Sequence, residues 1–130
     1  MIPFLDLDAA YRELSSGIDA AVLRVLRSGR YIGGEEVESF EREFAVWCGA
    51  KACIGVGNGY DALVIALRAC GIGEGDEVIV PSNTFIATWL AVSAVGATPV
   101  PVEPSEATYN IEASEIRGAL TSRTRAIIPV

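Results

Sequence analysis

The chain is 130 residues long, 51% of its residues are hydrophobic, and its formal net charge at pH 7 is −7. Its ten basic residues are scattered, so no basic face for nucleic acid is expected. No apolar run is long enough to span a bilayer, and the first residues lack the basic start and long apolar stretch of a signal peptide. The sequence therefore predicts a cytoplasmic protein without membrane contact.

The chain contains no histidine, which excludes Ser–His and Cys–His nucleophile pairs and removes the commonest metal ligand. Its cysteines, Cys48, Cys53 and Cys70, are widely spaced and lie in apolar contexts, so neither a disulfide framework nor a metal site is expected. We expect these cysteines to be small buried hydrophobic residues. Any chemistry at this chain must use another base or a cofactor.

Two amphipathic helices are predicted at the start of the chain. Apolar residues recur at intervals of three and four over residues 8–28 and again over residues 35–48. Each run is followed by a glycine, Gly29 or Gly49, that can end a helix. These helices form an N-terminal lead-in, residues 1–50, that must pack against something larger.

From residue 51 onward, strands and helices alternate. The predicted strands are 51–56, 77–80, 98–102 and 125–130, and the predicted helices are 60–70, 84–95 and 113–120. This alternation is typical of an α/β domain in which helices cover both faces of a mostly parallel sheet, giving a three-layer architecture. The last strand has the pattern of a core strand without a covering helix. Residues 51–130 are therefore expected to be the first, truncated part of a larger domain.

A glycine-rich turn leads from the first of these strands into a helix. Gly57, Asn58 and Gly59 occupy the turn, and either Asn58 or Gly59 can cap the helix. The free amides and positive dipole end of the helix would face a bound anion, so the turn predicts a site for a phosphorylated ligand. Tyr60 stands where a dinucleotide-binding G-x-G-x-x-G motif has its last glycine, which disfavours a nucleotide-binding reductase. A turn without any ligand is the remaining alternative.

Several motifs together resemble the DegT/DnrJ/EryC1/StrS family of sugar aminotransferases, pyridoxal-phosphate enzymes with the aspartate aminotransferase fold. These motifs lie at residues 28–34, 57–63, 73–81 and 84–88. Residues 83–89 and 102–111 are most similar to members that aminate C3 of a nucleotide-linked 3-keto-6-deoxyhexose. The resemblance covers the whole chain and implies the N-terminal segment of the large domain of fold type I, in incomplete form.

The resemblance also implies roles for individual residues. Gly59, Tyr60 and Asp61 match the helix start whose backbone amides bind the phosphate of pyridoxal 5'-phosphate. Phe85 matches the aromatic residue that stacks on the pyridine ring, and ordinary core packing is its alternative role.

Two further residues are candidates for substrate binding. Tyr31 lies in the turn that matches the active-site mouth of the family, although exposed loop tyrosines often have no function. Asn83, at the end of a strand, is placed to face the sugar, and solvated loop polarity is its alternative.

No catalytic residue is expected within the chain, because the family's Schiff-base lysine and the carboxylate that holds the pyridine nitrogen protonated both lie beyond residue 130. Lys51, the only lysine, is expected to be a surface residue. The implied enzyme is a homodimer with shared active sites that transfers an amino group from a donor such as glutamate to a nucleotide-linked keto sugar. The alternatives are an inert regulatory or binding module of the same fold and a sugar dehydratase of the same family.

Overall fold

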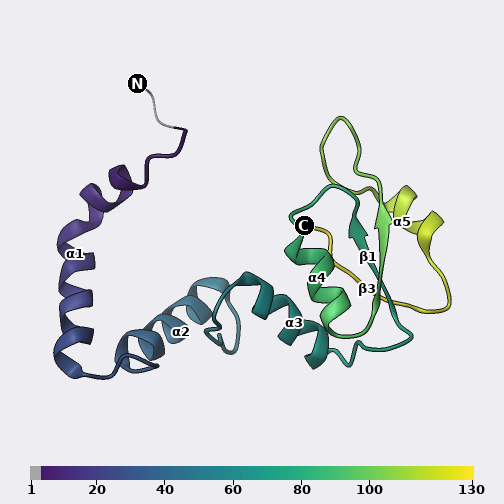
Figure 1. The fold of residues 1–130 in the computed structure, drawn as a ribbon. Helices are drawn as coiled ribbons and strands as arrows, with labels where there is room; N and C mark the ends of the chain where they lie inside the picture. Colours follow the sequence, from purple (N-terminus) through teal and green to yellow (C-terminus); the bar gives the residue numbers. More distant parts are fainter. Residues whose placement is uncertain (1–3) are drawn as a thin grey trace. The chain divides into compact units, whose positions relative to one another are not determined.

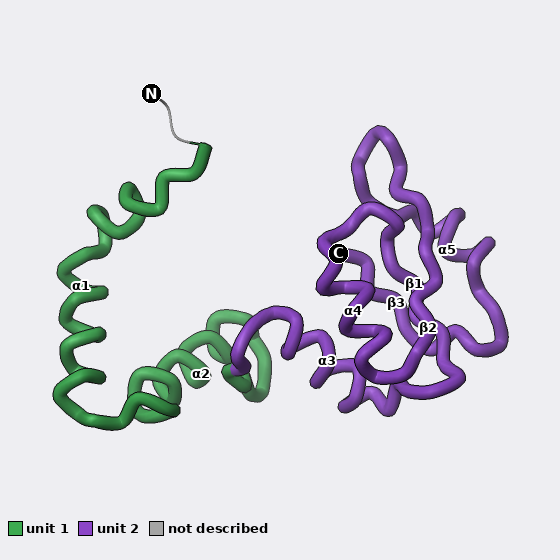
Figure 2. The backbone as a smooth tube through the Cα atoms, viewed as in Figure 1, with its two compact units in different colours: residues 1–55 green, residues 56–130 purple. Residues whose placement is uncertain are grey.

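The structure, a computed structural model, describes residues 4–130 and has an α/β architecture. It divides into two compact units at Gly55 and Val56 (Figure 2). Within the described residues, the first unit contains helices, and the second contains helices and a sheet. Among the helices of residues 4–130, none combines the length and the apolar character that crossing a membrane requires.

The first unit contains the two predicted helices, which are α1 (Leu7–Ser28) and α2 (Glu35–Cys48). The side chain of Asp6 caps α1 by accepting a hydrogen bond from a first-turn amide. Both helices end at a glycine in the left-handed region, where φ is 68° at Gly29 and 66° at Gly49. The two glycines therefore end the helices as predicted, because other residues adopt this conformation only at a cost.

The segment that follows α2 was predicted to be a strand, and this prediction is wrong. Residues 51–56 have no strand partner among the described residues and form no ladder. Instead, the N–H of Gly55 donates to Oε1 of Glu41 on α2 at 2.6 Å. A Cβ on Gly55 would lie 3.2 Å from the same oxygen, so this close approach favours glycine. The apolar pattern of a strand does not report whether a neighbouring strand is present to bond it.

The second unit alternates helices and strands as predicted (Figure 1). Its elements are α3 (Gly59–Ala69), β1 (Glu77–Pro81), α4 (Ala87–Ala94), β2 (Thr98–Val102), α5 (Ala113–Ala119) and β3 (Thr124–Ile127). The strands form a parallel sheet in the order β2-β1-β3, so β1 is central. α4 begins later than predicted because residues 82–86 form a separate turn, and β3 ends at Ile127 rather than Val130.

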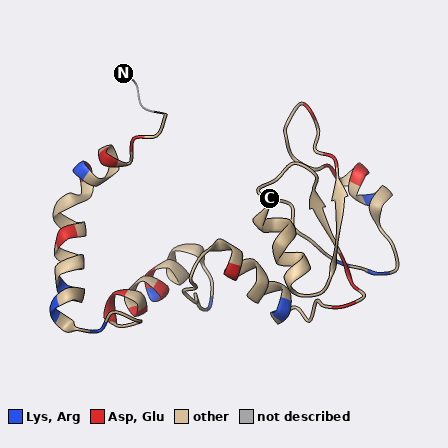
Figure 3. Cartoon of the chain, in the orientation of Figure 1, with Lys and Arg blue, Asp and Glu red and all other residues tan. Residues whose placement is uncertain are grey.

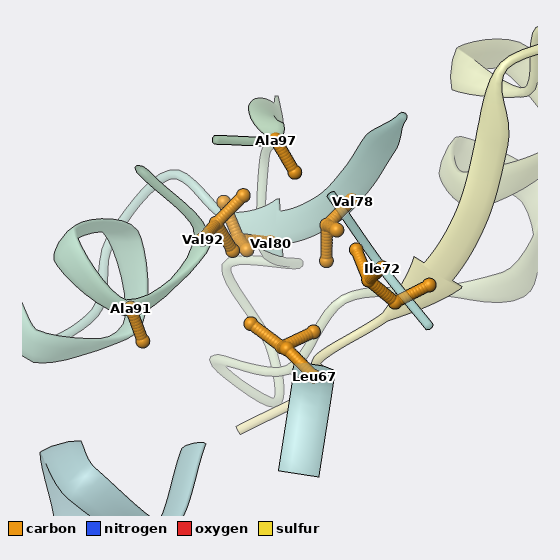
Figure 4. Close-up of a cluster of buried hydrophobic side chains, with 7 residues drawn as sticks. All are labelled: Leu67, Ile72, Val78, Val80, Ala91, Val92 and Ala97. Carbon is orange, nitrogen blue, oxygen red and sulfur yellow. The ribbon is translucent and has the colours of Figure 1, made fainter. Parts of the chain in front are cut away.

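The core of this unit is built on β1. Val78 and Val80 belong to a cluster that includes Leu67 of α3 and Val92 of α4 (Figure 4). Ile79 points to the opposite face, because side chains alternate along a strand, and it too is fully buried. Both faces of β1 are therefore covered, and the loop that follows β1 starts from a buried strand.

Cys48 and Cys70 are exposed, and Cys53 is half-buried, so the expectation of three buried cysteines is wrong. Cys48 is the last residue of α2, and Cys70 is the C-cap of α3. Their neighbours in the sequence are apolar residues or glycine, but a position at the end of a helix leaves the side chain accessible. Apolar context in the sequence did not distinguish a helix end from a helix interior.

A buried carboxylate ties the amino end of β1 to the loop before β3. Glu77 is 5% exposed. Its carboxylate accepts hydrogen bonds from the hydroxyl of Thr121 and from Nε of Arg123, the latter at 2.9 Å. The hydroxyl of Thr121, followed by the guanidinium of Arg123, holds the pKa of Glu77 below its ordinary value, although burial opposes this shift.

This lowered pKa predicts a loss of stability in acid. The contribution of Glu77 is fully present above the ordinary glutamate pKa of about 4.3 and is lost as the pH falls through the lower pKa of the folded state. Urea denaturation midpoints measured from neutral pH into this acid range should fall. Glu77→Gln should lower stability at neutral pH and flatten the pH dependence. Glu74→Gln, at an exposed position of the preceding loop, is the control and should leave the profile unchanged. A profile that Glu77→Gln does not alter would contradict the prediction.

Candidate functional site

The carboxyl ends of the parallel strands lie at one edge of the sheet, where ligands bind in α/β folds. β1 pairs with β2 as far as Pro81 and Val102, but it pairs with β3 only as far as Ile79 and Ile127. Pro81 has no N–H with which to extend the ladder towards β3. At this edge, the pairing of β1 with β3 therefore ends two residues earlier along β1 than its pairing with β2.

A cleft of about 670 Å³ opens on this side of β1. It is lined by residues of α3, of the turn before α4, of α4 itself and of the segment after β3. These residues are Asn58, Gly59, Tyr60, Leu63, Phe85, Ala87, Thr88, Ile128 and Val130. None of them is charged, and Figure 3 shows α4 without any acidic or basic residue. Within residues 4–130, the cleft therefore offers an anion hydrogen-bond donors and no basic side chain.

The start of α3 offers such donors. Asn58 is the N-cap, and its Oδ1 accepts the N–H of Asp61 at 2.9 Å. The N–H groups of Gly59 and Tyr60 donate to no acceptor among the described residues. Both amides belong to the positive end of the helix and to residues that line the cleft. These two amides are the donors that an anion would find here.

Asp61 differs from Gly59 and Tyr60, because its amide already donates to the capping side chain of Asn58 and is not available to a ligand. Its carboxylate accepts a hydrogen bond from Nδ2 of Asn58 at 3.0 Å. A Cβ on Gly57 would lie 2.8 Å from Oδ2 of Asp61, so glycine at position 57 makes room for this carboxylate. Gly55, Gly57 and Gly59 all lack positive φ, so none of them is needed for a left-handed backbone, and Gly55 and Gly57 are needed for space.

Tyr60 and Gly59 differ in what surrounds them. The side chain of Tyr60 packs against the core cluster of the unit, which leaves its amide as the group available to a ligand. A Cβ on Gly59 would meet nothing within 4 Å, and the backbone there has no positive φ. Neither packing nor conformation within this unit explains glycine at position 59, and the lack of a side chain there leaves the helix end open to an approaching anion.

Phe85 lies in the turn between β1 and α4 and is 80% exposed. It lines the cleft together with the helix start of α3, so a flat apolar face and a pair of free amides border the same space. Phe85 is not a core residue of this unit. The turn is held by two contacts, from Thr88 N–H to the carbonyl oxygen of Phe85 at 3.1 Å and between the hydroxyls of Thr84 and Thr88 at 3.2 Å.

The two candidates for substrate binding are not among the residues that line this cleft. Asn83 is exposed in the turn after β1. Next to it, Ser82 donates its hydroxyl to Glu103 at 2.5 Å, which joins the loops that follow β1 and β2. Tyr31 belongs to the first unit, where it is exposed and its hydroxyl donates to the carbonyl oxygen of Leu26 at 3.5 Å. Lys51 is exposed in the same unit.

The sequence did not point to several residues of the cleft. Leu63 follows Gly59 by one turn of α3, so helical spacing from Gly59 would have found it, whereas Thr88 lies in α4 and Phe85 in the turn before it. Ile128 and Val130 have no such signal, because they reach the cleft only through the early end of β3. Within residues 4–130, no group of histidine, cysteine and carboxylate side chains has an arrangement that could hold a metal ion.

Comparison with known proteins gives consistent matches. Residues 13–130 match the DegT/DnrJ/EryC1/StrS aminotransferase family. The chain is 59% identical to the dTDP-3-amino-3,4,6-trideoxy-alpha-D-glucose transaminase of Streptomyces venezuelae, over 99% of this chain and 34% of that protein.

Solved structures agree with this match. The crystal structure of S. venezuelae DesV superposes with a TM-score of 0.94 at 58% identity, covering 98% of this chain and 34% of that one. NtdA of Bacillus subtilis, solved with the bound cofactor PMP, has a TM-score of 0.91 at 34% identity, covering 98% and 30%. The second unit therefore has part of the aminotransferase fold, and the chain spans about a third of the length of these relatives.

Proposed function

Because this chain belongs to the DegT/DnrJ/EryC1/StrS aminotransferase family, we propose that it is part of a pyridoxal-phosphate-dependent sugar aminotransferase. The proposed reaction moves an amino group, with glutamate as the expected donor, onto a nucleotide-linked keto-deoxysugar, with a 3-keto-6-deoxyhexose favoured. The name of the S. venezuelae relative, a transaminase of a dTDP-linked 3-amino sugar, supports this substrate class.

The single observation that carries the proposal is the pairing of two unbonded amides with an exposed aromatic face. The N–H groups of Gly59 and Tyr60 suit a phosphate, and Phe85 on the same cleft suits a flat ring. Pyridoxal phosphate has both parts, so these residues fit it. NtdA, which shares the fold, binds the amino form of this cofactor.

Each residue then has a limited task. Gly59 and Tyr60 hold the phosphate through their amides, and Phe85 fixes the plane of the ring. Asp61 supports the cap from its bond to Asn58. When bound, pyridoxal phosphate supplies the electron sink for proton abstraction and amino transfer. The residues of this chain contribute the orientation of the bound cofactor.

The remaining assignments concern the whole protein. We propose that Tyr31 and Asn83 each contribute to binding of the sugar substrate, and that the protein is a cytoplasmic homodimer with shared active sites. A regulatory module would bind the cofactor without turning over an amino donor. A sugar dehydratase would use the cofactor to remove a hydroxyl group, so the products of one incubation distinguish the three candidates.

Lysine mapping tests the proposal. The protein is saturated with pyridoxal phosphate and reduced with borohydride, and the modified lysine is identified by peptide mass analysis. Lys51, which is exposed in the first unit, should stay unmodified. In the full-length protein, one lysine outside residues 1–130 should be modified, and a dTDP-linked 3-keto sugar should be aminated. Residues 1–130 alone should do neither. Stoichiometric modification of Lys51 together with turnover would refute this assignment.

A further inference from the structure

Pro81, the last residue of β1, is buried, and its carbonyl oxygen needs a hydrogen-bond donor. Ser82 N–H bonds to Val102 of β2, and Ile128 N–H bonds to the carbonyl oxygen of Ile79, so alternate residues of β1 face β2 and β3. By this alternation, the carbonyl group of Pro81 points towards β3. The pairing of β1 with β3 has already ended at Ile79, so β3 offers it no N–H. It would be unpaired without a donor from elsewhere, and an unpaired buried carbonyl is costly.

Trp89 of α4 supplies that donor. Its indole Nε1–H donates to the carbonyl oxygen of Pro81 at 3.2 Å, and its ring packs against the core cluster of the unit. The bond fixes the first turn of α4 to the end of β1. Thr88, the preceding residue, is 5% exposed and holds the carbonyl oxygen of Phe85 through its own N–H. The short turn that carries Phe85 is therefore tied at both of its ends.

We propose that Trp89 is a positioning residue for the cofactor ring, an inference that rests on the proposed role of Phe85. Phe85 is exposed, so core packing does not hold its side chain in place. Its orientation depends on the backbone of residues 82–86. Ser82 anchors the start of this turn to β2, and the bond from Trp89 to Pro81 anchors the helix that follows the turn to the central strand. Trp89 itself does not line the cleft, so its effect must pass through Phe85.

The test compares the two tryptophans of the chain in the full-length protein. Trp89→Phe removes the indole N–H and keeps an aromatic ring. Trp47→Phe makes the same change at a position on α2 that is 80% exposed, and it serves as the matched control. The measurements are the affinity for pyridoxal phosphate, the induced circular dichroism of the bound cofactor, and hydrogen exchange of the segment 82–90 in the cofactor-free protein.

Trp89→Phe should weaken cofactor affinity roughly threefold to tenfold, which corresponds to the loss of one hydrogen bond. It should also change the dichroism band and speed exchange in segment 82–90, while Trp47→Phe changes none of these. If Trp89→Phe fails to fold, replacement of Trp89 by benzothienylalanine, which has the shape of tryptophan without the N–H, decides in its place. Unchanged affinity and dichroism in Trp89→Phe, or in the benzothienylalanine variant where that one is used, would overturn the inference alone. Absence of binding by the unmodified protein would overturn the proposed function and the inference with it.

Discussion

Gly59→Ala should lower the affinity for pyridoxal phosphate by about tenfold to a hundredfold, the value of one charge-assisted hydrogen bond, while leaving the folded state as stable as before. The added methyl group would meet no atom of the unit within 4 Å, and the backbone at position 59 suits any residue. It would, however, point towards the amino end of the helix, which is the end that the phosphate has to approach. Isothermal titration and thermal unfolding of the same preparation measure the two effects.

Gly57→Ala is the matched control for this change. Its methyl group would stand 2.8 Å from Oδ2 of Asp61, so the carboxylate must turn away and release Nδ2 of Asn58. Stability should fall by about 0.5–1.5 kcal/mol, the net value of a hydrogen bond. If Gly59→Ala destabilised the protein as much as Gly57→Ala and bound the cofactor normally, glycine at position 59 would serve the fold and not the ligand.

Phe85→Ala should weaken cofactor retention roughly tenfold, because ring stacking contributes about 0.5–1.5 kcal/mol beyond the apolar area it covers. It should lower kcat as well, since a ring free to tilt no longer holds the substrate bond in the reactive orientation. Unfolding free energy should change by no more than about 0.5 kcal/mol, as is usual for an exposed side chain.

Ile86→Ala is the control for Phe85→Ala. Ile86 is the next residue of the same turn, is exposed, and does not line the cleft. Its replacement should leave both kcat and cofactor affinity close to those of the unmodified protein. A Phe85→Ala variant that lost thermal stability but retained the cofactor would identify Phe85 as a packing residue and refute the stacking role.

Sequence patterns predicted the helices and their ends because these features depend on residues that are close together in the chain. Apolar spacing located both helices of the first unit, and Gly29 and Gly49 ended them through the left-handed backbone that glycine adopts. The geometry on which the proposed anion site rests was predictable for the same reason, since the cap at Asn58 and the free amides after it lie within a few consecutive residues.

Features that depend on distant neighbours were not predictable in this way. The strand expected at 51–56 needs a partner that its own alternation cannot indicate. Cys70 has an apolar context and yet lies exposed at the end of α3. The cleft itself results from the register of β1 against β3, which Pro81 ends early, and from the placement of Ile128 beside α3 and α4.

The most direct measurement is the response of two backbone amides to the cofactor. In the protein labelled with ¹⁵N, pyridoxal phosphate should shift the amide resonances of Gly59 and Tyr60 more than that of Asp61, whose N–H is already bonded to Asn58. Inorganic phosphate should move the same two resonances, and pyridoxal without its phosphate should not. Saturable binding of pyridoxal phosphate that left Gly59 and Tyr60 unchanged would contradict the assignment of the helix start of α3 as the phosphate site.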